Sequence, residues 1–222
     1  MERKDSSKII AIVALVLAIV GVSIGFAAFS NTLTIKSTAA VSPDEDTFDV
    51  NFSSTSGTET DGDVVASPAE DSSEVYKGAT ATIDNSTNAP TITGLHADFT
   101  KPGQKVTYSF YAHNNGEYIA YLNSITFANV TGATATKVCT AAEGTSQALV
   151  DTACSDIVIS VKVGDQLYDG SAADISGHSL VRDAYEPIVV SIEYKTNENV
   201  NVADGDFTVA FGDISLVYSS VD

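Results

Sequence analysis

The stretch Val106-Thr107-Tyr108-Ser109-Phe110-Tyr111-Ala112 alternates between two faces, with Val106, Tyr108 and Phe110 together on one of them. Alternation with a period of two in β-branched and aromatic residues is the pattern of a half-buried β-strand. The same pattern recurs at 157–163, 188–194 and 207–211, and more weakly at 48–52, 79–83, 91–99, 118–127 and 214–218. Many short strands without helical periodicity predict an all-β fold, an antiparallel β-sandwich of jelly-roll type.

Two turns between these strands have a defined chemistry. Lys101-Pro102-Gly103-Gln104 places Pro and Gly at the two central positions of a type II turn. Asn114-Asn115-Gly116 favours left-handed backbone conformations, so we expect it to close a hairpin between strands that end at His113 and begin at Glu117.

The start of the chain has the pattern of an export signal. A basic segment, residues 2–8, precedes an uncharged apolar run from Ile9 to Ala28, and the small residue Ala28 predicts cleavage before Phe29. A run of about 20 apolar residues is also long enough to span a bilayer. Residues 1–28 are therefore expected to be a cleaved signal peptide or a retained membrane segment. In both cases we expect the rest of the chain outside the cytoplasm, extracellular or at the cell surface.

The net charge of the chain excludes one class of partner. The chain carries 11 Lys and Arg against 29 Asp and Glu, a net charge of −18. Such a surface repels nucleic acid, which we exclude as a partner. We expect residues 42–222 to form one β-sandwich domain, preceded by the terminal segment 1–28 and the strand 29–41.

The two cysteines, Cys139 and Cys154, both lie in the exported part. An even count in an oxidising compartment predicts one disulfide between them, and free thiols are the alternative. The small-residue stretch Ala141–Ala153 between the cysteines predicts a loop without a core of its own.

An acidic stretch separates the first predicted strands. Residues 44–75 contain ten carboxylates and no Lys or Arg. We expect Ser53–Ser73 to form an exposed, mobile insertion, because such a segment buries too little apolar area to offset its ordering entropy. Calcium at Asp61-Gly62-Asp63 or at Asp44-Glu45-Asp46 is a weaker alternative, since the EF-hand spacing is missing.

No set of residues predicts catalysis. His96, His113 and His178 are far apart in the sequence, and none belongs to an H-E-x-x-H motif. His96 and His113 lie within predicted strands and could meet across the sheet, although ordinary strand positions explain them better. We expect no enzyme and no cofactor, with a secreted metallopeptidase as the alternative that zinc analysis would reveal.

The strand after the signal is amphipathic. Its odd positions carry the apolar residues Phe29, Leu33, Ile35, Ala39 and Val41, and its even positions are mostly Ser, Thr and Lys. One interpretation is the first strand of the chain's own sandwich. The other is a donor strand that completes a sheet in a neighbouring subunit, with main-chain hydrogen bonds at the acceptor's edge and alternate side chains in its pockets.

Two patches resemble a known family. Gly25-Phe26-Ala27-Ala28-Phe29-Ser30-Asn31 followed by the amphipathic strand, and the segment from Lys101-Pro102-Gly103-Gln104 to Asn114-Asn115-Gly116, are similar to the TasA/camelysin family of exported biofilm-matrix fibre proteins. The cysteine pair and the acidic stretch depart from the family pattern.

The resemblance implies a jelly-roll subunit that is cut by a SipW-type signal peptidase. It also implies a homopolymer built by donor-strand complementation, together with other matrix or cell-surface components. The family's camelysin branch has been classed as a metallopeptidase, but no matching ligand set occurs in this sequence. The alternative function is a membrane-anchored, pilin-like or adhesion protein that keeps its N-terminal helix.

Overall fold

The computed structural model describes residues 48–57, 62–65, 67–68, 80–86, 89–168, 175, 178–196 and 199–220. The chain divides into two units, Met1–Ser42 and Pro43–Asp222, and every described residue belongs to the second. All strand pairs among these residues are antiparallel. The predicted all-β class is therefore confirmed for the second unit.

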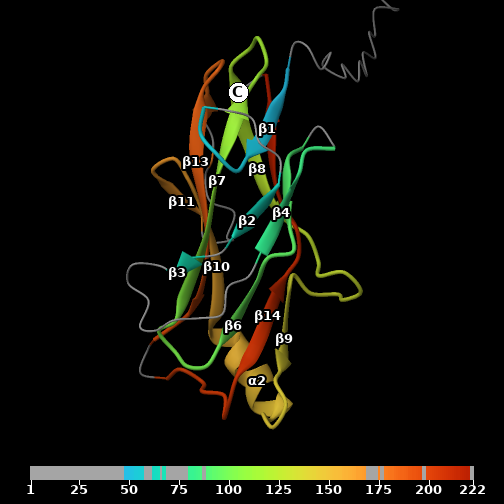
Figure 1. The fold of residues 1–222 in the computed structure, drawn as a ribbon, viewed down its shortest axis with the longest axis vertical. Coiled ribbons are helices and arrows are strands. Elements are labelled where there is room, and N and C mark those ends of the chain that lie inside the picture. The colour runs from blue at the N-terminus through green and yellow to red at the C-terminus, as the bar shows by residue number, and fades with distance from the viewer. Residues whose placement is uncertain are drawn as a thin grey trace, which may run out of the picture. The chain divides into compact units, whose positions relative to one another are not determined.

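One layer of the unit is a sheet that we call sheet A. Its two longest strands lie side by side at its centre (Figure 1). In spatial order its strands are β1 (Val50–Ser53), β7 (Lys105–Asn114), β13 (Tyr185–Tyr194), β10 (Ile157–Val163) and β11 (Gln166–Tyr168), and β3 (Ser67–Pro68) also pairs with β7.

Two shorter sheets, B and C, make the other layer. Sheet B has the order β12 (Ser179–Leu180), β8 (Ala120–Phe127), β15 (Ile214–Ser219), β5 (Thr91–Thr93), β4 (Thr80–Asp84) and β2 (Asp63–Val65). Sheet C has the order β6 (His96–Phe99), β14 (Phe207–Phe211) and β9 (Lys137–Ala141). Along the chain β5 leads into β6, β14 leads into β15, and β8 is followed by β9. The order β8, β15, β5 in sheet B therefore corresponds to the order β9, β14, β6 in sheet C, and the two sheets form one layer with a break.

The break between sheets B and C depends on a close backbone contact. A Cβ atom on Gly212 would lie 2.0 Å from the Ala128 carbonyl oxygen, so only glycine fits there. The Gly212 N–H donates to the Thr136 carbonyl oxygen at 3.0 Å, and the Ala128 N–H donates to that of Asp213 at 2.8 Å. Gly94 lies between β5 and β6 and adopts a φ of +74°, a left-handed conformation that interrupts the strand.

The layers bury a shared core. Tyr194 of sheet A packs edge-on against Phe99 and Phe207 of sheet C, with ring centroids 5.9 and 5.6 Å apart. The alternation predicted for β7 is observed, because Val106, Tyr108 and Phe110 are all buried. Bounds match the predicted runs at β10 and β14. The unit is therefore sandwich-like.

The expected hairpin at Asn114-Asn115-Gly116 is wrong. β7 belongs to sheet A and β8 to sheet B, so this turn connects the two layers instead of two paired neighbours. The turn at Lys101–Gln104 has the predicted positive φ at Gly103, +88°, and it also connects the layers.

The acidic stretch is only partly the insertion that we expected. Two short strands, β2 and β3, lie within it and pair with β4 and β7. Val64 supplies the physical reason, because its side chain is 4% exposed and anchors β2 in the core. The four residues 58–61 and the eleven residues 69–79 lie outside the described part.

Candidate functional site

The residues that sequence reasoning placed at the assembly site precede the described part of the chain. They are the cleavage pair Ala28 and Phe29 and the apolar face of the expected donor strand, Leu33, Ile35, Ala39 and Val41. The described unit supplies the surfaces on which such a strand would act: the sheet edges and the end of the unit where the chain enters.

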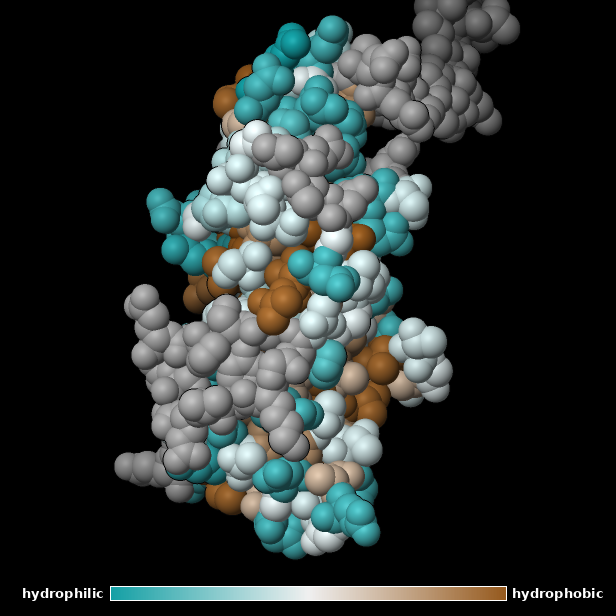
Figure 2. Space-filling view, in the orientation of Figure 1, coloured by the Kyte–Doolittle hydropathy of each residue, from teal (hydrophilic) through white to brown (hydrophobic). Residues whose placement is uncertain are grey.

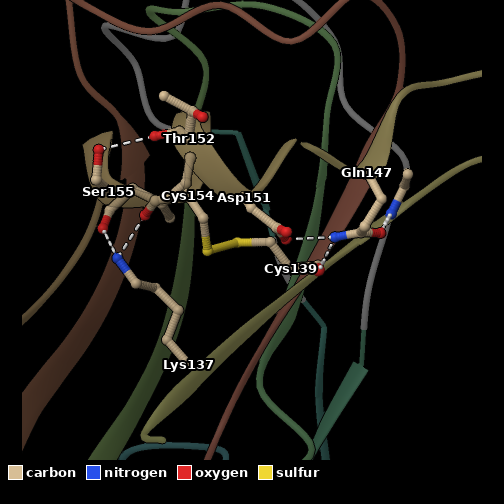
Figure 3. The surroundings of a disulfide bond; sticks show 9 residues. Lys137, Cys139, Gln147, Asp151, Thr152, Cys154 and Ser155 are labelled. Carbon is tan, nitrogen blue, oxygen red and sulfur yellow. Dashed lines mark hydrogen bonds between the residues drawn. A yellow bond between two sulfur atoms is a disulfide. The ribbon is translucent and has the colours of Figure 1, made fainter. Parts of the chain in front are cut away.

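The predicted disulfide is present. Cys139 of β9 and Cys154 are bonded, with Cα atoms 6.0 Å apart (Figure 3). The bridge joins sheet C to the short 3-10 helix η1 (Cys154–Asp156), directly before β10 of sheet A. It therefore links the two layers at the end of the unit opposite Asn114.

The loop closed by the disulfide has no core separate from that of the sandwich, as expected, but it contributes residues to the shared core. It contains the helix α2 (Gln147–Ala153), which buries Val150 and Ala153 completely. The helix also covers an edge of sheet C. The Gln147 side chain accepts a hydrogen bond from the Ala141 N–H at 2.9 Å and donates one to the Cys139 carbonyl oxygen at 3.0 Å. This amide takes the place of a neighbouring strand, so β9 is a blocked edge.

Lys137 reinforces the same clamp. Its Nζ donates to the carbonyl oxygens of Cys154 and Ile157, both at 2.6 Å (Figure 3). Burial lowers the pKa of the Lys137 ammonium, and the nearby Asp156 carboxylate acts in the opposite direction. The ammonium thus ties β9 to the start of β10 beside the disulfide.

The other edge of sheet C is open in part. The Phe211 N–H donates to the Leu95 carbonyl oxygen at 2.9 Å, so in this register Ala97 and Phe99 form the paired positions with β14. The main-chain groups of His96 and Asp98 then point away from the sheet. At His96 the Tyr108 hydroxyl satisfies them: it accepts from the N–H at 3.3 Å and donates to the carbonyl oxygen at 2.5 Å.

At Asp98 no partner occupies the outward N–H and carbonyl within the described part of the chain. The Asp98 carboxylate is used internally, where it accepts a hydrogen bond from the Thr208 hydroxyl. Within the described part of the chain, the β6 edge therefore has one unpaired main-chain position, at Asp98. Sequence reasoning missed it, because the pairing with β14 decides which β6 residues direct their N–H and carbonyl groups toward the sheet and which direct them outward.

The opposite end of the unit is organised around Asn114, and we call it the Asn114 pole. The Asn114 side chain donates to the carbonyl oxygens of Tyr118 and Leu180 at 2.8 and 2.9 Å, and it accepts from the Gly116 N–H at 3.1 Å. The described chain begins beside these hydrogen bonds, because the Asp49 carbonyl oxygen accepts hydrogen bonds from the N–H groups of Asn115 and Gly116.

A buried polar cluster lies just inside this pole. The His178 Nε2 and Glu186 Oε2 atoms are 2.8 Å apart, and both side chains are mostly buried. Burial raises the pKa of the Tyr218 phenol, and the charge of Glu186 adds to this shift. The Tyr218 hydroxyl is buried and has no hydrogen-bond partner among the described residues.

The histidines do not form a shared site. His96 belongs to sheet C and His113 to sheet A, so the two do not meet across one sheet, and both occupy strand positions as the favoured interpretation had it. His113 instead stacks on Tyr185, with ring centroids 4.0 Å apart. Among the described residues no three His, Cys, Asp or Glu side chains are grouped to hold a metal ion. Asp44, Glu45, Asp46 and Asp61 of the calcium alternatives lie outside them.

One hollow of about 370 Å³ opens at the break between sheets B and C. Its walls include Leu95, Val130 and Phe211, with His96 and Asp213 among the polar residues. The His96 Nδ1 donates to the Gly94 carbonyl oxygen at 2.8 Å, so this ring nitrogen is already used. The hollow follows from the break, and its lining predicts no particular chemistry.

The exposed surface of the described part is mainly polar, with apolar residues in separate patches on the face that Figure 2 shows. No helix in the described part is long and apolar enough to cross a membrane. Comparison with protein-family models, with curated proteins and with solved structures finds no match to the chain.

Proposed function

We propose that this chain is a structural subunit of an extracellular surface or biofilm-matrix filament, assembled by donor-strand complementation. The observation that carries the proposal is the position of the amphipathic strand 29–41. It follows an export signal and precedes a unit in which residues from Val50 to Tyr218 supply both layers of a buried core. A strand with one apolar face outside such a unit is suited to complete a sheet in another copy.

The resemblance to the TasA/camelysin family supports the same assignment, and so does the topology. Four strands in the order β1, β7, β13, β10 face four in the order β8, β15, β5, β4. Eight antiparallel strands in two facing sheets agree with a jelly roll in strand number and direction. We therefore assign the second unit to the jelly-roll type, with a SipW-type signal peptidase and other matrix components as further partners.

Substitutions on the two faces of the strand test the proposal. The protein collected from outside the exporting cells is compared with the double variant Leu33→Asp/Ile35→Asp and with the control Thr32→Asp/Thr34→Asp. The first places carboxylates on the apolar face and the second places them on the polar face of the same strand. Electron microscopy is expected to show filaments for the unaltered protein and the control, and monomers for the first variant. Monomeric unaltered protein at high concentration, or filaments of the first variant, would overturn the proposal.

We assign the acceptor position to the β6 edge. β9, the opposite edge of sheet C, is covered by α2 and Gln147, whereas Asp98 directs an N–H and a carbonyl outward. Asp98→Pro removes the outward N–H without removing a main-chain bond to β14, and Asp98→Ala keeps that N–H; both variants lose the Thr208 side-chain bond equally. Assembly is expected to fail in the proline variant alone. Equal assembly of both variants would place the acceptor elsewhere.

N-terminal sequencing of the exported protein separates the filament subunit from the membrane-anchored alternative. A mature chain that begins at Phe29 is the expected result. A chain that begins near Met1 would show that the apolar run is retained and would favour the pilin-like or adhesion protein.

A further inference from the structure

We infer that the surface formed by Tyr118, Ile119 and Val181 at the Asn114 pole contacts a second copy of this chain in the filament. The inference rests on the proposed function and adds the second interface that the donor strand alone does not provide. Three observations support it: the adjacency of the three side chains, the place where the chain enters the unit, and the net charge.

The three residues form one apolar patch. Their exposed fractions are 56% for Tyr118, 44% for Ile119 and 55% for Val181. The Asn114 Nδ2 donates to the carbonyl oxygens of both Tyr118 and Leu180, so the two chain segments meet at one atom. In the register of β12 with β8, Leu180 pairs with Ala120, which places Val181 next to Ile119. The other large apolar residues exposed in the described part, Val65, Leu149, Leu167 and Val202, come from separate elements.

The chain enters the unit beside this patch. The Asp49 carbonyl oxygen accepts the N–H groups of Asn115 at 2.9 Å and Gly116 at 3.1 Å, so Phe48 lies at the same pole. Seven residue steps separate Val41 from Phe48, which reach at most about 25 Å when fully extended. A folded unit of about 180 residues has a radius of gyration of about 16 Å. An acceptor copy that holds strand 29–41 therefore has part of its surface within about 25 Å of Phe48.

The geometry of the unit is consistent with a head-to-tail contact. β7 runs ten residues from Lys105 to Asn114, which corresponds to about 30 Å. β6 ends at Phe99, and a short turn joins it to the start of β7 at Lys105. The β6 edge therefore lies near the end of the unit where β7 begins. β1, the first described strand, thus lies toward one end of the unit, and β6, which carries the assigned acceptor edge, lies toward the other (Figure 1).

Charge explains why this contact is apolar. Each copy carries a net charge of −18, so two copies repel each other over most of their surfaces. A contact between copies therefore requires surface with few carboxylates and apolar area to bury. The patch supplies that area, and of its charged neighbours Arg182 is paired with Asp183 at 3.3 Å, which leaves Glu117, within the described part of the chain, as the unpaired charge beside it in the sequence.

Two matched variants of the exported protein test the inference. Ile119→Asp/Val181→Asp places carboxylates in the patch. The control Leu167→Asp changes a more exposed apolar residue, 65% exposed, on the edge strand β11 of sheet A. The lowest concentration that sustains filaments is measured by sedimentation, and circular dichroism verifies the fold. We expect this concentration to rise at least about tenfold in the double variant, because carboxylates would have to be buried at the contact, and to stay within about twofold in the control.

The possible results distinguish a failure of this inference from a failure of the proposed function. If the double variant assembles at the same concentration as the control, the patch is not an interface and the inference fails while the donor-strand proposal stands. If the unaltered protein forms no filaments, both fail. If the double variant alone loses assembly and keeps its fold, the patch is the second contact.

Discussion

The Asn114 side-chain amide donates a hydrogen bond to the Leu180 carbonyl oxygen at 2.9 Å, across 66 residues of sequence. The same nitrogen donates to Tyr118, and the Asn114 carbonyl oxygen atom of the side chain accepts from the Gly116 N–H. Asn114 is fully buried, so each of these bonds forms away from water. One side chain therefore holds the turn 114–118 together and joins it to the segment at Leu180, at the end of the unit where the described chain begins.

Replacing Asn114 is expected to destabilise the whole pole. Asn114→Ala would leave the Tyr118 and Leu180 carbonyl oxygens without this donor, at a cost of about 2–4 kcal/mol in the free energy of unfolding. Asn114→Asp keeps the acceptor for Gly116 but places a carboxylate against two carbonyl oxygens, so we expect at least the same loss. Urea unfolding measures both. A loss below about 0.5 kcal/mol in the alanine variant would contradict the assigned role.

Reduction of the Cys139–Cys154 bridge is expected to weaken the unit without unfolding it. A closed loop of about 15 residues corresponds to roughly 3 kcal/mol in the chain-entropy model. The fold should survive, because α2 buries Val150 and Ala153 and Lys137 still ties β9 to β10. The double variant Cys139→Ser/Cys154→Ser is the control, since its melting temperature should not respond to reductant. Two readily alkylated thiols in the native exported protein would show that the bridge is absent.

Because the Tyr218 phenol is buried, we expect the free energy of unfolding to fall at alkaline pH. Its folded pKa is raised above the value of 10.0 for the free phenol, mainly by burial. The contribution to stability is therefore complete below pH 10 and is lost as the pH rises above it, where the unfolded chain releases the proton first. Tyr218→Phe removes this loss. It should also raise the free energy of unfolding at pH 7 by about 1 kcal/mol, because the hydroxyl is buried without a described partner.

Tyr118→Phe is the matched control for the tyrosine experiment, because Tyr118 is exposed. Its free energy of unfolding should follow that of the unaltered protein at every pH. The same alkaline loss in Tyr218→Phe and in the unaltered protein would refute the assignment to Tyr218.

Gly212→Ala tests the break between sheets B and C. The added methyl group would meet the Ala128 carbonyl oxygen at 2.0 Å, and this backbone cannot rotate away as a side chain could, so we expect a loss of about 1–3 kcal/mol. Gly205→Ala is the comparison, because the nearest neighbours of its methyl group all belong to the Thr145 side chain, which can shift more easily than backbone. Thermal unfolding should rank Gly212→Ala well below Gly205→Ala. Equal melting temperatures would show that the break tolerates a side chain.

Local alternation was enough to predict most strands. The runs that became β10 and β14 have the predicted bounds, because their apolar positions alternate without interruption. The predicted strand 91–99 is divided into β5 and β6, since Gly94 has a φ of +74° that no alternation pattern reveals. The disulfide was predicted from the cysteine count together with the expected oxidising compartment.

The pairing of the strands was not predictable from local pattern. Asn114-Asn115-Gly116 has hairpin composition, yet the buried Asn114 side chain bonds to Leu180, and the turn crosses between layers. The helix α2 was missed because small residues in a short segment carry little periodicity. Gln147 and the outward groups of Asp98 depend on which neighbour covers each edge of sheet C, and that is decided by tertiary contacts.

Amide hydrogen exchange on assembled protein tests the central claim most directly. Fragments that cover 29–41 and 96–99 are compared between monomer and filament of the exported protein. If strand 29–41 of one copy pairs with the β6 edge of another, both fragments gain protection together on assembly, on the order of a hundredfold for the donor strand. Filaments in which residues 29–41 exchange as fast as in the monomer would contradict the donor-strand account.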